Sequence, residues 1–208
     1  MNKKQKYTFI SLMLASTVAA YAQYQMNVFS IDLITAYQIS ASRFAFLFTA
    51  PMLPAIFLSI PLGKLSDKIG YRNAIQLGLV FTILGLAGRI FAESYSTLWI
   101  CMAFSGASSI TLFVNSARVL EEVVPAEKSV LFMGIYTTAS MLAQTFATAT
   151  SAVLYSTLQK AYVGSLVYAV VITVIWAGNY CIEKENAENT EFRNADRSSE
   201  QKENFRKF

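Results

Sequence analysis

Long apolar runs, separated by short polar or charged segments, make up most of this chain. The runs at 44–62 and 74–88 contain no Asp, Glu, Lys or Arg. A helix rises about 1.5 Å per residue, so each run and its flanking residues could cross the ~30 Å hydrocarbon core of a bilayer. The whole pattern predicts six membrane-spanning helices, at about residues 7–31, 43–62, 74–91, 98–120, 130–154 and 163–182.

The predicted fold is therefore all-α, with a six-helix transmembrane domain over residues 1–182 and a polar tail over residues 183–208. The tail mixes six basic and seven acidic residues. It is too polar to bury a core, so we expect it to be cytoplasmic and disordered. Within the second helix, Pro51, Pro54 and Pro61 predict kinks.

Composition supports a membrane protein. Hydrophobic residues make up 54% of the chain and charged residues 14%, against about 25% charged in soluble domains. The net charge of +4 does not indicate nucleic acid, because the basic residues cluster in predicted cytoplasmic segments. Cys101 and Cys181 fall near opposite membrane faces in this map, so we expect no disulfide between them.

The distribution of basic residues predicts the orientation. Of the 17 Lys and Arg residues, only Arg43, Arg89 and Lys160 fall on the predicted outer side. Cytoplasmic segments of membrane proteins carry an excess of Lys and Arg. We therefore expect both termini in the cytoplasm, with outer loops at 32–42, 93–97 and 156–162.

The N-terminal segment has two interpretations. A basic start, an apolar stretch and Ala20-Tyr21-Ala22 before Gln23 describe a cleaved signal peptide. The apolar character continues through residues 26–29, however, which gives a full membrane span. The excess of Lys and Arg on the cytoplasmic side does not distinguish a cleaved signal peptide from a retained helix, because the second helix begins on the outside in either case.

Residues 63–72 read GKLSDKIGYR and connect the second predicted helix to the third. We expect a tight basic loop, in which two glycines permit the turn. The segment resembles the signature loop of the major facilitator superfamily, G-x-L-[AS]-D-[RK]-x-G-x-[RK]. The residues that match are Gly63, Leu65, Ser66, Asp67, Lys68, Gly70 and Arg72. Tyr71 is a minor departure. The resemblance also favours a retained first helix.

In the resembled family, six helices form one half of a twelve-helix transporter, and the solute binds between the halves. The resemblance implies a secondary transporter of a small solute that works by alternating access. It implies a half that needs a second half, either another copy of this chain or a separate chain. The family's signature Asp contacts the second half, so Asp67 would lack that partner within its own chain. Arg118 has several candidate partners: Asp67, Glu121, Glu122 or lipid phosphates.

The resemblance also implies a cavity lined by the first, second, fourth and fifth helices. Polar residues that recur at helical spacing are then candidates for solute contacts. They are Tyr21, Gln25, Ser108, Asn115, Thr137, Ser140 and Gln144. Hydrogen bonding between helices is the alternative, and it is common for Ser and Thr. Gln144 is the strongest candidate, because an amide in the middle of a membrane is costly without a partner.

The sequence says less about the mode of transport than about the fold. No Asp or Glu lies deep in a predicted helix, and no Pro follows Pro125, so an antiporter-type Gly-Pro motif is absent from the fifth helix. Symport or facilitated passage is favoured. Arg43 and Arg89 suggest an anionic solute at the outer mouth, although both could instead extend to the membrane interface.

Enzyme functions lack the residues they need. The chain has no His to activate a nucleophile and no glycine loop to hold a phosphate. We expect neither catalysis nor a metal or cofactor. The expected setting is the plasma membrane, with lipid and a small solute as ligands and no nucleic acid. The alternative function is a membrane protein without transport activity, either a truncated product or an interaction partner.

Overall fold

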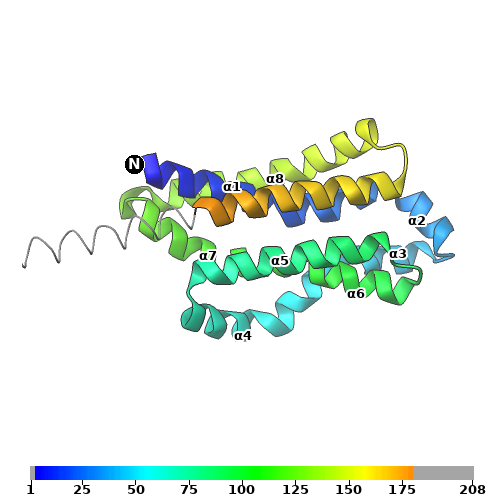
Figure 1. The fold of residues 1–208 in the computed structure, drawn as a ribbon, viewed down its shortest axis with the longest axis horizontal. Helices are drawn as coiled ribbons and strands as arrows, with labels where there is room; N and C mark the ends of the chain where they lie inside the picture. Colours follow the sequence, from blue (N-terminus) through cyan, green and yellow to red (C-terminus); the bar gives the residue numbers. More distant parts are fainter. Residues whose placement is uncertain (1–2, 180–208) are drawn as a thin grey trace, which may run out of the picture.

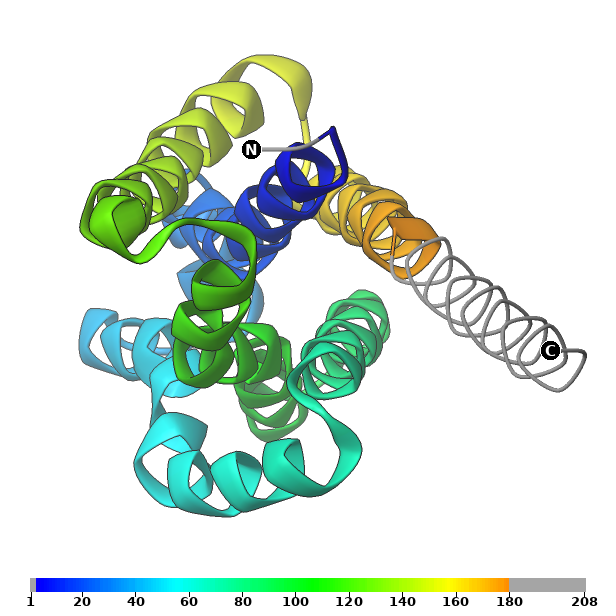
Figure 2. The same cartoon turned by 90° about the vertical axis from the view of Figure 1, so that its left-hand side faces the viewer.

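The computed structural model describes residues 3–179, which fold into helices and short helical turns, without a strand in that part of the chain. Figures 1 and 2 show an elongated bundle whose long helices run roughly side by side. α1 (Lys3–Tyr24) and α7 (Ala107–Val123) lie in its middle, whereas α4 (Leu53–Ile69) and α8 (Ser129–Leu154) lie at opposite edges. The all-α fold class predicted from the sequence is confirmed.

Five helical segments are long and apolar enough to cross a membrane. They are Ala41–Ile69, Tyr71–Ile90, Tyr95–Val123, Ala126–Leu154 and Leu158–Asn179. The remaining long helix, α1, carries polar residues that include Thr8, Ser11 and Ser16, and all three are buried. A helix surrounded by other helices can carry more polar residues than one that faces lipid, because its neighbours satisfy them.

The first predicted helix is interrupted. It was expected to run over residues 7–31, but α1 ends at Tyr24. A short 3₁₀ turn, η1 (Gln25–Asn27), and a separate helix, α2 (Ser30–Ala36), follow it. α2 also makes the predicted outer loop at 32–42 partly helical.

The second and fourth predicted helices are interrupted where they meet. The second consists of α3 (Ala41–Thr49), the turn η2 (Ala50–Met52) and α4, with Pro51 at the break. The fourth consists of α6 (Tyr95–Ser105) and α7, which are separated at Gly106. A Cβ on Gly106 would lie 2.1 Å from the carbonyl oxygen of Pro51. Only glycine permits this approach, so the two breaks pack against each other.

The expected signature loop is largely helical, and that prediction was wrong. Residues 63–69 belong to α4, and α5 (Tyr71–Ile90) begins immediately after Gly70. Gly70 alone makes the turn, with a φ of 84° and a ψ of 141°, a conformation almost restricted to glycine. The charged residues of the motif therefore lie on helix ends, where their spacing is fixed.

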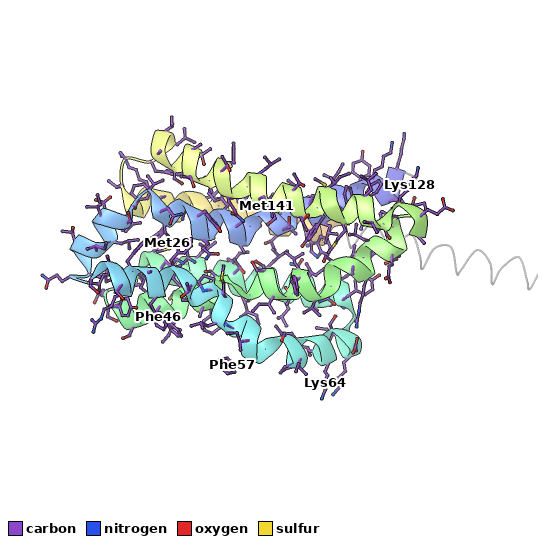
Figure 3. The ribbon with its side chains drawn as sticks, turned by 180° about the vertical axis from the view of Figure 1, so that it is seen from behind. Met26, Phe46, Phe57, Lys64, Lys128 and Met141 are labelled. Atoms are coloured by element: carbon purple, nitrogen blue, oxygen red, sulfur yellow. The ribbon has the colours of Figure 1, made fainter. Side chains whose placement is uncertain are left out.

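The remaining connections are short. The turn η3 (Ala126–Lys128) joins α7 to α8, and the last described helix begins at Leu158, earlier than the predicted residue 163. Lys64 and Lys128 lie at the same end of the bundle as the start of α1 (Figure 3). The predicted end of the last helix at residue 182, the tail at 183–208 and Cys181 fall outside the described residues.

The core and the surface have the composition of a bundle in lipid. The main core cluster includes Leu12 of α1, Leu79 of α5 and Leu112 of α7, all nearly inaccessible. Large apolar side chains cover the outside, for example Phe46 and Phe57, which are 52% and 75% exposed (Figure 3). In water such a surface would drive association, whereas in a bilayer it faces hydrocarbon.

Candidate solute-binding groove

A groove with a partly polar lining lies between α1, α7 and α8 and has a volume of about 300 Å³. Its lining residues are Ser16, Ser109, Leu112, Phe113, Tyr136, Thr137, Ser140, Met141 and Gln144. We call it the polar groove. Thr137, Ser140 and Gln144 follow one another at spacings of three and four residues, which places them on one face of α8. The groove thus collects hydroxyl and amide groups from three helices.

The polar groove continues toward one end of the bundle. A second hollow of about 360 Å³ shares Thr137 with it and extends between α7 and α8 to Ser129 and Glu121. Its remaining lining residues are Ala117, Leu120, Val130, Met133 and Gly134. α7 and α8 therefore leave two neighbouring hollows between them, the second of which lies toward the end of the bundle that carries Lys128.

The structure brings together three of the seven predicted solute contacts, namely Thr137, Ser140 and Gln144. The other four are engaged between helices. The Tyr21 hydroxyl lies 3.0 Å from Thr150 Oγ1 on α8. Gln25 is buried, and its Nε2 donates to Ser165 Oγ at 2.9 Å.

The predicted contacts on α7, Ser108 and Asn115, also face neighbouring helices. Ser108 is fully buried, and its backbone N–H donates to Thr82 Oγ1 of α5 at 3.1 Å. Asn115 donates to the carbonyl of Thr111 at 2.7 Å and accepts a hydrogen bond from the Ser66 hydroxyl of α4. The polar face of α7 thus packs against α4 and α5, away from the polar groove.

Two polar groove residues, Ser16 and Ser109, were missed in the sequence. Ser109 directly follows Ser108, and the helical stripe through Ser108, Thr111 and Asn115 pointed to the wrong face. Ser16 donates to the carbonyl of Met13 at 2.7 Å, as serines in helices commonly do. Neither residue belongs to a polar stripe of its own, so periodicity offered no signal for them.

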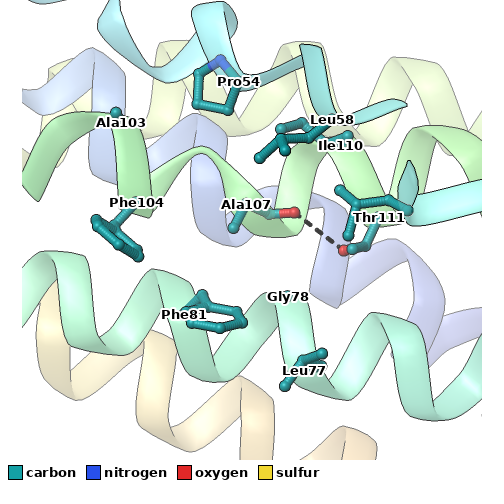
Figure 4. A pocket seen from close by; sticks show the side chains of 11 residues that line it. Pro54, Leu58, Leu77, Gly78, Phe81, Ala103, Phe104, Ala107, Ile110 and Thr111 are labelled. Atoms are coloured by element: carbon teal, nitrogen blue, oxygen red, sulfur yellow. Dashed lines mark hydrogen bonds between the residues drawn. The ribbon is translucent and has the colours of Figure 1, made fainter. Parts of the chain in front are cut away.

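A different groove lies on the other side of α7, between α4, α5, α6 and α7 (Figure 4). It has a volume of about 260 Å³, and its lining residues are Pro54, Leu58, Leu62, Leu77, Gly78, Phe81, Ala103, Phe104, Ala107, Ile110 and Thr111. We call it the apolar groove. Its only side-chain hydroxyl, on Thr111, donates to the carbonyl of Ala107 at 3.1 Å. This groove offers a polar solute almost nothing to bind.

Ion pairs join the helix ends at the signature motif. Arg118 Nη1 of α7 lies 2.6 Å from Asp67 Oδ1 of α4. Arg72 Nη2 of α5 lies 3.0 Å from Glu122 Oε1 of α7, and the Tyr71 hydroxyl donates to the other oxygen of that carboxylate. Among the partners considered for Arg118, the structure pairs it with Asp67. α7 is therefore tied to both α4 and α5 at this end.

The two arginines predicted for the outer mouth differ sharply. Arg43 is exposed, and its guanidinium lies 5.9 Å from the ring centre of Tyr95. Arg89 is 1% exposed and bonds to α1 and α6, so its placement at an outer mouth was wrong. Its position near the end of α5 suggested an interface, but the side chain finds acceptors inside the bundle. Neither arginine lines the polar groove.

The apolar spans, the central polar groove and the paired helix ends define a multi-pass α-helical membrane protein of the transporter kind. Residues 12–207 match the Major Facilitator Superfamily, so the chain belongs to that family and is a membrane transporter of the major facilitator type. No curated protein matches the chain.

Proposed function

We propose that this chain moves a small polar solute across a membrane by alternating access, with the polar groove as its contribution to the solute path. The observation that carries this proposal is the gathering of Thr137, Ser140 and Gln144 with Ser109 and Ser16 in one open groove. Solute sites combine an apolar lining with a few convergent polar groups, and this lining has that character.

A neutral solute has more support than an anionic one. Hydroxyl and amide groups line the polar groove, and the charged residue on its extension is the acidic Glu121. Arg43 and Arg89, which suggested an anion, lie elsewhere. The polar groove residues include no carboxylate, which argues against a proton relay there, and the missing Gly-Pro motif favours symport or facilitated passage over antiport.

Cysteine modification tests the solute path. In a Cys101→Ala and Cys181→Ala background, Ser140→Cys should be alkylated by a water-soluble maleimide. Uptake of a panel of radiolabelled neutral polar solutes into proteoliposomes should then stop. Lys160→Cys is the matched control, because that exposed residue should react without blocking uptake. Saturable uptake that continues after complete modification of Ser140→Cys would refute the proposed path.

We also propose that a second six-helix unit covers the polar groove. Among the described residues, the side-chain amide of Gln144 has no hydrogen-bond partner. A polar group facing lipid is costly, and alternating access rocks two units around a central site. A second copy of this chain or a separate unit would cover it. Disulfide crosslinking through Ser140→Cys in native membranes tests this, and a chain that transports while remaining uncrosslinked and monomeric would contradict it.

We propose a plasma-membrane location with both termini in the cytoplasm. Lys64 and Lys128 lie at one end of the bundle with the basic start of α1, as the excess of basic residues on the inner side requires. Reporter fusions at Lys68 and Lys128 should read inside, and fusions at Ala36 and Lys160 should read outside. An external reading at Lys68 would reverse the proposed orientation.

A further inference from the structure

Arg89 is a buried cation without an acidic partner among the described residues. Its side chain is almost inaccessible, and its hydrogen-bond acceptors are all neutral. Nη1 donates to the carbonyl of Ala22 at 2.8 Å and approaches Met26 Sδ at 3.9 Å, while Nη2 donates to the Ser105 hydroxyl. A buried guanidinium stays charged, so the structure around it has to stabilise that charge.

Helix ends supply the stabilisation. α1 ends at Tyr24, two residues after Ala22, and α6 ends at Ser105 itself. The C-terminal end of a helix carries a partial negative charge from its unpaired carbonyl groups. The Ser105 hydroxyl extends the link, because it also donates to the carbonyl of Met102 at 2.7 Å. Arg89 thus lies where the C-terminal ends of two interrupted helices converge.

These helices belong to different parts of the bundle. α1 packs mainly along α8 and α7, whereas α6 packs on α5 (Figure 2). Arg89, from α5, is therefore a buried polar link from α5 and α6 to α1. The continuation of α6 beyond its break is α7, which supplies Ser109 to the polar groove, and α1 supplies Ser16. The link therefore joins a helix that lines the groove, α1, to the helix that continues into another, α7.

We propose that Arg89 is a positioning residue, a built-in cation that fastens the ends of α1 and α6 together and so fixes the width of the polar groove. Its consequence for transport rests on the proposed function, whereas its effect on groove geometry does not. Two different nitrogens reach the two helices, so the planar fork matters as well as the charge. A lysine has a single nitrogen and cannot make the same bridge.

The test measures how accessible the polar groove is to a water-soluble reagent, and it does not require a transport assay. In the Cys101→Ala and Cys181→Ala background, Ser109→Cys reports the polar groove through its alkylation rate with a water-soluble maleimide. We expect Arg89→Met and Arg89→Lys each to raise that rate at least threefold. We expect Arg43→Gln, the removal of an exposed arginine, to leave it unchanged. In Arg89→Ala, guanidinium chloride should restore the rate to within twofold of the parent, and sodium chloride at equal ionic strength should not.

Ser105→Ala keeps the Arg89 guanidinium and removes one of its hydrogen-bond acceptors. It is the alternative variant if the Arg89 variants fail to fold. It should raise the alkylation rate in the same direction. An unchanged rate in both Arg89→Met and Ser105→Ala would overturn the proposal, and so would a lysine variant that matches the parent. Loss of transport with an unchanged rate would also count against positioning. A changed rate in a chain that moves no solute would support positioning and count against the proposed function alone.

Discussion

The two sides of α7 present opposite chemistry with the same backbone. On one side, Ala107 and Ile110 line the apolar groove, and the single hydroxyl there is bonded to a backbone carbonyl. On the other side, Ser109 faces the polar groove together with Thr137 and Gln144 of α8. The volumes are similar, about 260 and 300 Å³, so size does not separate the two grooves. The available hydrogen-bonding groups do.

Polar residues on a membrane helix are therefore not by themselves evidence of a solute site. Asn115 and Ser108 are polar and deeply buried, and through the Asn115 side chain and the Ser108 backbone N–H this face of α7 bonds to α4 and α5. The groups available to a solute are those that line an open groove and are not bonded to a neighbouring helix. Substitutions on the two sides of α7 should therefore differ in their effect on uptake.

The largest effect is expected for Gln144→Leu. It removes the amide that faces the polar groove and leaves a solute group without its partner. Such a loss costs roughly 1–3 kcal/mol, or about 5- to 150-fold in uptake. Thr111→Val, on the apolar side, should change uptake less than about twofold by the same reasoning. Initial uptake rates in proteoliposomes with matched protein content compare them, and equal losses would erase the distinction.

Asp67→Asn should reduce uptake severalfold while the protein still inserts and folds. The Asp67–Arg118 pair is exposed, and surface pairs contribute only about 0–1 kcal/mol to stability. Its charge ties the ends of α4 and α7 within one unit, and we expect its loss to disturb the equilibrium between inward- and outward-open states. Arg118→Gln should act similarly, and the double variant should be no worse than either one. Additive losses in uptake would show that the two residues work separately.

A matched pair on α7 gives the smallest difference. Ser109→Leu places bulk in the polar groove and should lower uptake severalfold. Ala107→Leu, two residues away, places the same bulk in the apolar groove, which has room for it. Its effect on uptake should stay within about twofold, and its cost in stability should stay below the roughly 1–3 kcal/mol of the same change in a well-packed core. Thermal unfolding in detergent and uptake should be measured together, and a reversed order would contradict the assignment of the two grooves.

The sequence predicted the long helices well, because uncharged apolar runs leave few alternatives in a membrane. It also placed Thr137, Ser140 and Gln144 on one face of α8. The breaks at Gln25 and Gly106 were missed, because both fall within segments that were expected to be unbroken spans. The break at Gly106 also depends on a tertiary contact, the close approach to the Pro51 carbonyl.

Periodicity identifies a polar face of a helix but not what that face meets. Ser108 and Asn115 do lie on one face of α7, but that face packs against α4 and α5. Arg89 was misplaced for a related reason. Its acceptors are a backbone carbonyl of α1 and a serine of α6, and a pattern within α5 cannot reveal contacts with other helices. The signature motif was recognised, but its helical conformation depends on a single turn residue, Gly70.

The most direct test compares thiols in the two grooves. In the Cys101→Ala and Cys181→Ala background, Ser140→Cys and Leu58→Cys should be exposed to a membrane-impermeant maleimide in intact membranes. The thiolate is the reactive form and needs an aqueous environment, so Ser140→Cys should react at least about tenfold faster than Leu58→Cys. A solute that is transported should slow the reaction at Ser140→Cys. Equal rates at the two positions, or faster labelling at Leu58→Cys, would contradict the assignment of the polar groove as the solute path.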